Sequence, residues 1–84
     1  MKYQAEIDIM PLKELLDPQG KAVMQGLKNL EFGSVEQVRI GKHIQMRIEA
    51  GNEEEAKSKI TDACEKLLAN PVIESFEFTL EETS

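Results

Sequence analysis

The side chains that most often carry out catalysis are scarce in this chain. His43 is the only histidine and Cys64 the only cysteine. A general base needs an orienting partner and a nucleophile, and a zinc site needs more nitrogen and sulfur ligands than these two residues supply. Cys64 lies on an apolar stripe beside Glu65, whereas a reactive thiolate needs an accessible, electropositive position. We therefore expect His43 on the solvent face of a strand and Cys64 in the core.

Two further segments could suggest a ligand, but each fits a simpler role. Residues 53–55 are all glutamate, and acidic residues gather in the first turn of a helix because the helix dipole favours negative charge there. Gly20-Lys21 lacks the upstream glycine and the following serine or threonine of a phosphate-binding loop. We therefore expect no metal, cofactor or ATP site in this chain alone.

Two glycine-containing segments are candidates for contacts with a partner. Arg39-Ile40-Gly41-Lys42 places two cations around a glycine in an acidic chain, and a glycine lets another backbone approach closely. Asp17-Pro18-Gln19-Gly20 places a glycine inside the first turn of a helix, at a cost of about 1 kcal/mol relative to alanine, which indicates close packing there. The simpler alternatives are solvated charges on a hairpin and an ordinary helix start.

Hydrophobic periodicity predicts the elements that position these residues. Residues 3–9 alternate between apolar and polar side chains, which predicts a half-buried strand closed by Pro11. After a connector over residues 12–16, Asp17 is placed to cap a helix whose first residue is Pro18. Gly33 is expected to end this helix in a left-handed conformation. The predicted buried stripe of the helix consists of Val23, Leu27 and Leu30.

Residues 35–50 carry apolar side chains mostly at even positions, and two arrangements fit this pattern. One unbroken strand would span roughly 53 Å, about twice the width of so small a body. We therefore favour two strands, 35–41 and 43–50, with a kink or bulge at Gly41. The alternative is one long bent strand that projects beyond its own domain and serves as a dimer arm.

A second helix and a last strand complete the chain. Asn52 and Glu55 predict a capping box at the start of the helix. The helix is expected to run to about Leu68, and the last strand over residues 72–81. The predicted buried positions are Ala56, Ile60, Cys64 and Leu67 in the helix, with Ala63 and Leu68 beside them, and Phe76, Phe78 and Leu80 in the strand.

The element order predicts an α+β domain of the split β-α-β-β-α-β type, related to the ferredoxin-like fold. We expect a mainly antiparallel sheet with a two-helix layer on one face and a radius of gyration of roughly 12 Å. The opposite sheet face must be polar or covered. Dimerisation through the sheet, or through a long bent strand, would cover it.

Length and composition restrict the class of function. The 84 residues carry a net charge of −6, and a single domain over 1–84 leaves little interior for both a core and a ligand pocket. An acidic chain poor in aromatic residues does not match a nucleic-acid surface. No apolar run approaches the length of a membrane span, and a signal peptide is not indicated. We therefore expect a cytoplasmic bridging or regulatory subunit rather than a self-contained enzyme.

Three segments, in this order and spacing, resemble the PurS family, the small subunit of phosphoribosylformylglycinamidine synthase. They are Asp17-Pro18-Gln19-Gly20, then Val38-Arg39-Ile40-Gly41-Lys42, then residues 64–70 followed by Val72-Ile73-Glu74. The resemblance covers the chain from about residue 3 to residue 80 and implies a non-catalytic subunit of an enzyme in de novo purine biosynthesis.

The resemblance also implies a reaction and its participants. The complete enzyme would convert formylglycinamide ribonucleotide, glutamine and ATP into formylglycinamidine ribonucleotide, glutamate, ADP and phosphate. A glutaminase subunit would release ammonia, and a large synthetase subunit would use ATP and magnesium. The small subunit, a dimer or a dimer of dimers, would join the two and assist ammonia transfer. We expect its partner contacts at Asp17, Pro18 and Gly20 on one edge, and at Arg39, Ile40, Gly41 and Lys42 on another.

Two other classes of protein remain open at this point. A ferredoxin-like regulatory module would bind a small metabolite at a dimer interface, and its melting temperature would depend on that ligand. A ferredoxin-like RNA-binding module would show salt-sensitive binding of oligonucleotides, which the net charge of −6 and the absence of adjacent strand aromatics disfavour.

Overall fold

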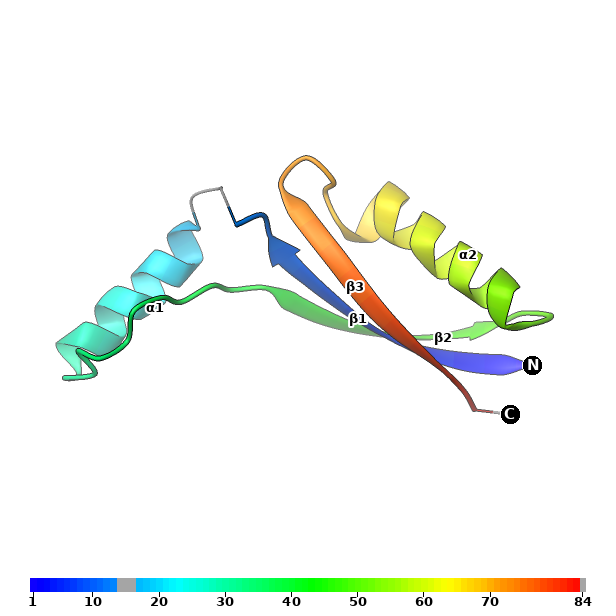
Figure 1. Ribbon diagram of the computed structural model, residues 1–84, viewed down its shortest axis with the longest axis horizontal. Coiled ribbons are helices and arrows are strands. Elements are labelled where there is room, and N and C mark those ends of the chain that lie inside the picture. Colours follow the sequence, from blue (N-terminus) through cyan, green and yellow to red (C-terminus); the bar gives the residue numbers. More distant parts are fainter. Residues whose placement is uncertain (14–16, 84) are drawn as a thin grey trace.

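Three strands and two helices make up the protein, as a computed structural model describes it for residues 1–13 and 17–83. In chain order they are β1 (Lys2–Pro11), α1 (Pro18–Asn29), β2 (Lys42–Glu49), α2 (Glu53–Ala63) and β3 (Glu74–Glu82) (Figure 1). One turn of π-helix, η1 (Cys64–Leu68), extends α2. Of the predicted connector over 12–16, residues 14–16 lie outside the described residues.

The sheet is built around β1, its middle strand. The order is β2-β1-β3, and both pairs of neighbours are antiparallel. Ile7 stands opposite Ile44 on β2 and Phe78 on β3. Because successive side chains point to opposite faces of a strand, the odd-numbered residues of β1 share one apolar face with both neighbours. The α+β class and the antiparallel sheet are thus confirmed.

α2 covers this apolar face (Figure 1). The helix begins as predicted, because the Asn52 side chain accepts the Glu55 N–H at 2.8 Å and the Glu55 carboxylate accepts the Gly51 N–H at 2.9 Å. Ile60 and Cys64 are fully buried and pack against Ile7 and its neighbours on β1. The predicted core positions of β1 and of the first two turns of this helix are therefore confirmed.

The end of α2 differs from the prediction because the last turn is wider than an α-helical turn. The Ala69 N–H donates to the carbonyl oxygen of Cys64, five residues earlier, at 2.9 Å. A π-turn of this kind changes which side chains face the sheet. Leu67, predicted to be buried, is 82% exposed, whereas Leu68 packs against the core.

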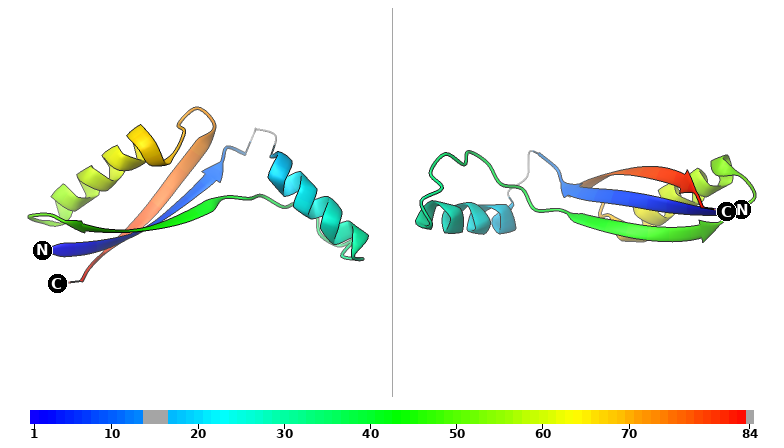
Figure 2. Two further views of the ribbon diagram at one scale, coloured as in Figure 1. Left: turned by 180° about the vertical axis from the view of Figure 1, so that it is seen from behind. Right: turned by 90° about the horizontal axis from the view of Figure 1, so that it is seen from below.

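The position of α1 also corrects the prediction. Instead of joining α2 in a layer over the sheet, α1 extends past the end where β1 finishes and β2 begins (Figures 1 and 2). Its predicted buried stripe is not buried: Val23 is 43% and Leu30 70% exposed, and Leu27 is only partly buried. Gly33 does not end the helix. Glu31 adopts the left-handed conformation at φ 70°, and the Phe32 N–H closes the turn on Leu27.

Residues 35–40 form no strand within the described part of the chain, and no hairpin turn occurs at Gly41. The segment runs from the end of α1 directly into β2 (Figure 2). The predicted strand over 35–41 is therefore wrong, whereas the one over 43–50 corresponds to β2, and the alternative of a projecting arm is closer to the structure. The molecule measures 51 × 26 × 14 Å and has a radius of gyration of 16.5 Å. It exceeds the expected radius because α1 and this segment, which together we call the arm, extend away from the sheet.

Candidate functional site

The two segments predicted to contact partners meet at one place, where the arm joins the sheet. The Asp17 carboxylate accepts the Gly20 N–H at 3.0 Å through Oδ1, and the Ile40 N–H at 2.9 Å through Oδ2. One side chain therefore caps α1, as predicted, and also holds the segment that leads into β2. We call this place the junction and define it by Asp17, Gly20, Val38, Arg39 and Ile40. The two separate edges expected from the sequence are one site.

Gly20 is the only residue of α1 that is buried. A Cβ atom at this position would overlap the carbonyl oxygen of Val38. The close packing that a glycine in the first helical turn indicated is confirmed, and the group that packs there is the backbone of the same chain. Gly20 therefore allows α1 and residues 35–40 to lie in direct contact.

Charge reinforces the junction. The Arg39 guanidinium donates a hydrogen bond to the carbonyl oxygen of Pro11 at the end of β1. Hydrogen bonds from the Gly20 and Ile40 N–H groups lower the pKa of Asp17 below its ordinary value, and the nearby Arg39 charge acts in the same direction. Asp17 is therefore ionised at neutral pH, and its charge strengthens both hydrogen bonds that it accepts.

Gly41 also packs against its own chain. A Cβ atom on Gly41 would overlap the carbonyl oxygen of Ile9 and the sulfur of Met10. The close approach expected from this glycine is thus used to bring residue 41 against β1. Pro18 and Lys42, by contrast, are exposed next to the junction, so their side chains are available to a partner.

Two hollows flank the junction. One, of about 220 Å³, is lined by residues that include Lys21, Met24 and Gln37. The other, of about 550 Å³, lies between Pro18, Ile40 and Ile73. Both are open to the surface. Charged residues make up half of the lining of the first hollow, whereas the second is lined mainly by uncharged residues, which suits contact with another protein surface. No group of three or more potential metal ligands occurs within residues 1–13 and 17–83, and no helix there is long and apolar enough to cross a membrane.

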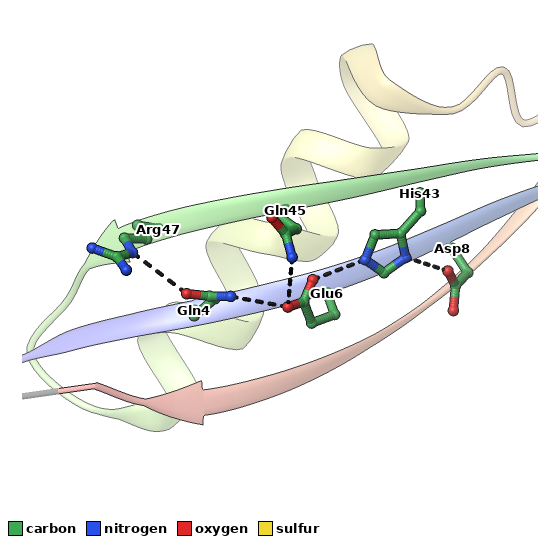
Figure 3. Close-up of polar contacts among 6 residues, drawn as sticks. All are labelled: Gln4, Glu6, Asp8, His43, Gln45 and Arg47. Carbon is green, nitrogen blue, oxygen red and sulfur yellow. Dashed lines mark hydrogen bonds and ion pairs between the residues drawn. The ribbon is translucent and has the colours of Figure 1, made fainter.

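His43 and Cys64 make none of the contacts of the junction. Cys64 is buried, as predicted, and burial raises the pKa of its thiol. His43 is on the face of the sheet opposite α2, also as predicted, but it lies between the carboxylates of Asp8 and Glu6 (Figure 3). Sequence reasoning missed this cluster, because its formation depends on the register of β1 against β2. The alternation of both strands was its only signal.

Comparison with known proteins gives one consistent result. The family model described as PurS, phosphoribosylformylglycinamidine (FGAM) synthase, matches residues 4–82. The chain is 41% identical over 78 residues to the synthase subunit PurS of Synechocystis sp., covering 93% of this chain and 78% of that protein. It is 38% identical to the corresponding subunit of Methanocaldococcus jannaschii, covering 94% and 95% of the two chains.

Solved structures agree with this result over nearly the whole chain. Bacillus subtilis PurS superposes with a TM-score of 0.88 at 36% identity, covering 95% of this chain and 99% of that one. A chain in the structure of PurLQS from Thermotoga maritima superposes with a TM-score of 0.87 at 32% identity, covering 96% and 99%. The projecting position of α1 is therefore part of a fold that these proteins share.

Proposed function

Because the chain belongs to the PurS family and is thus a subunit of phosphoribosylformylglycinamidine synthase in purine biosynthesis, we propose that it joins the glutaminase and synthetase subunits of that enzyme and assists ammonia transfer between them. The observation that carries the proposal is the match to the PurS family over residues 4–82. The likeness to a chain of PurLQS from Thermotoga maritima supports an assembly of the same kind.

The chemistry of ammonia gives the proposed role a physical reason. In water at neutral pH ammonia is largely protonated and loses its nucleophilicity, so a passage that excludes water between two active sites preserves it. A bridging subunit contributes by holding the two enzymes in a fixed relative position. In this proposal ATP and magnesium act in the synthetase subunit, and the present chain takes no part in bond formation.

The elongated shape supports such a bridging role. The arm and the sheet lie at opposite ends of a molecule 51 Å long, so the two ends can contact different proteins. At the junction, Asp17, Gly20 and Arg39 bind the protein's own backbone. We assign them the role of fixing the angle of the arm, and we assign direct contact with a partner to the exposed Pro18 and Lys42.

A reconstitution tests the proposal directly. The synthetase and glutaminase subunits are mixed with and without this chain, and product is measured first with glutamine and then with an ammonium salt as the nitrogen source. We expect the chain to raise the glutamine-dependent rate by roughly tenfold or more and to leave the ammonia-dependent rate unchanged. If both rates are indifferent to the chain, the coupling role is wrong, and a metabolite screen on the isolated protein follows.

Reversing the charge of Lys42 should weaken assembly without unfolding the subunit. The Lys42 side chain is exposed beside the junction, and a charge at the rim of an interface acts through long-range attraction. We expect Lys42→Glu to raise the Kd for at least one partner about tenfold, and the double variant with Arg39→Glu to raise it further. Titration calorimetry measures the Kd, and circular dichroism checks the fold.

Lys66→Glu is the control for Lys42→Glu, because Lys66 is an exposed cation on η1, outside the junction. It makes the same change in net charge, so a general effect of charge would appear in both variants. If the variant carrying both Arg39→Glu and Lys42→Glu binds both partners as the unaltered chain does, Lys42 makes no contact that contributes to docking.

A further inference from the structure

The only histidine of the chain lies between two carboxylates on the open face of the sheet. His43 Nδ1 is 2.6 Å from Oδ1 of Asp8, and Nε2 is 2.8 Å from Oε2 of Glu6 (Figure 3). Asp8 stands directly opposite His43 in the β1–β2 register, and Glu6 is two residues away on the same face of β1. The imidazole ring therefore spans the two strands at the end of the ladder nearest the arm.

This geometry requires a proton. A neutral imidazole has one N–H donor and one lone-pair acceptor, whereas an ionised carboxylate only accepts. With neutral His43, one ring nitrogen would direct its lone pair at a carboxylate oxygen within 2.8 Å. Only the imidazolium form, with two N–H donors, satisfies both contacts. The hydrogen bonds that Glu6 also accepts from Gln4 and Gln45, at 2.9 and 3.2 Å, keep that carboxylate ionised.

The charged groups around His43 are mostly negative. β1 contributes Glu6 and Asp8. From β3, Glu77 stands opposite Asp8 and lines a hollow of about 520 Å³ that also contains Asp8 and His43. β2 contributes Lys42, which lines the same hollow. Arg47 lies farther along β2, with its Nε 3.4 Å from the Gln4 side chain. Three carboxylates therefore oppose one nearby ammonium group, and the hollow is open to water.

The location connects this cluster to the arm. His43 is the second residue of β2 and lies three positions after Ile40. The Ile40 N–H is in turn held by the Asp17 carboxylate. The first β2 residues paired to β1 are Lys42 and His43, so they are the first sheet contacts that the chain makes after the junction. We propose that protonated His43 is a pH-dependent clamp that fastens the start of β2 to β1 and thereby controls how firmly the arm is held.

The direction of the pH dependence follows from the same contacts. Hydrogen bonds first to Asp8 and then to Glu6 raise the pKa of His43 above its ordinary value of 6.5. A group whose pKa is raised by folding stabilises the folded state fully below its unfolded pKa, and that stability is lost as the pH rises through the folded pKa. The clamp is therefore closed in mildly acidic solution and opens as the pH rises through the raised pKa of His43.

A nuclear magnetic resonance titration of the whole chain tests the clamp. Since the chain has a single histidine, its Hε1 signal reports the pKa of His43 without assignment ambiguity. We expect a midpoint above 6.5 in the unaltered chain, and lower midpoints in Asp8→Asn and Glu6→Gln, which remove one charge each. A midpoint at or below 6.5 in the unaltered chain would overturn the proposal.

A second measurement separates the clamp from a passive surface contact. The ¹⁵N–{¹H} nuclear Overhauser effect at the Ile40 and Gly20 amides should fall with the same midpoint as the His43 signal, and it should stay constant with pH in His43→Gln. The Ala56 amide in α2 is the internal control. The melting temperature should fall from pH 6 to pH 8.5 relative to His43→Gln, because the stability from the raised pKa of His43 is lost as the pH rises. If His43 titrates as expected but Ile40 does not respond, control of the arm is refuted.

Discussion

Replacing Gly20 by alanine will release α1 from residues 35–40 and leave the three-stranded sheet folded. The added Cβ atom overlaps the backbone carbonyl of Val38, which no change of rotamer can move, so the two segments must separate. We expect this to cost about 1–3 kcal/mol and to break the hydrogen bond from Ile40 to Asp17. The glutamine-dependent rate of the reconstituted enzyme should then fall about tenfold, while circular dichroism still reports the strands.

Gly26→Ala provides the matched control on the same helix. A Cβ atom at Gly26 meets nothing within 4 Å, and alanine is the better helix former, so this variant should be more stable by about 0.5–1 kcal/mol. Its glutamine-dependent rate should equal that of the unaltered chain. If Gly20→Ala and Gly26→Ala behave alike, residues 35–40 do not rest on α1, and the junction has no role in positioning the arm.

Replacing Ile60 by alanine will lower the free energy of unfolding by about 2–5 kcal/mol. Ile60 is fully buried between α2 and β1, and the loss leaves a cavity in a core supplied by one helix and three strands. Because small domains are stable by only about 5–15 kcal/mol in total, the midpoint of urea unfolding should shift to a clearly lower concentration. Urea denaturation followed by circular dichroism measures the change.

Leu67→Ala is the corresponding control and also tests the π-turn. Leu67 is 82% exposed, so its truncation should change the free energy of unfolding by no more than about 0.5 kcal/mol. Continued α-helical geometry after Ala63 would direct Leu67 toward the sheet instead. A loss of 2 kcal/mol or more from Leu67→Ala would therefore contradict the wider turn from Cys64 to Leu68.

Local features of this protein were predictable from its sequence because their causes are local. The caps at Asp17 and Asn52 and the apolar alternation of β1 each involve residues within four positions of one another. The position of α1 was not predictable in this way. An amphipathic stripe indicates that a helix has an apolar side, but it does not identify the surface that the side faces.

The same distinction applies to residues 35–40 and to the candidate site. The alternating pattern of residues 35–40 indicates an extended chain. Whether another strand pairs with that chain depends on residues far away in the sequence. Gly20 and Gly41 drew attention because glycine is unfavourable or unusual where they occur. The contacts these glycines allow are distant in the sequence, because Gly20 packs against Val38 and Gly41 against Ile9. The hydrogen bond between Asp17 and Ile40 spans 23 positions, and the pairing of His43 with Asp8 spans 35. Contacts of that range follow from the register of the sheet, which composition and periodicity do not specify.

Because both oxygens of Asp17 are used, the start of α1 and the docking of Ile40 are coupled events. A helix of 12 residues is marginal in water by itself, so α1 gains stability when its capping carboxylate is also fixed by the Ile40 N–H. Breaking either hydrogen bond frees the carboxylate and weakens the other. The arm therefore forms a cooperative unit of its own, able to melt and reform while the sheet and α2 stay intact. A subunit built in this way can adjust one end to a partner without unfolding the other.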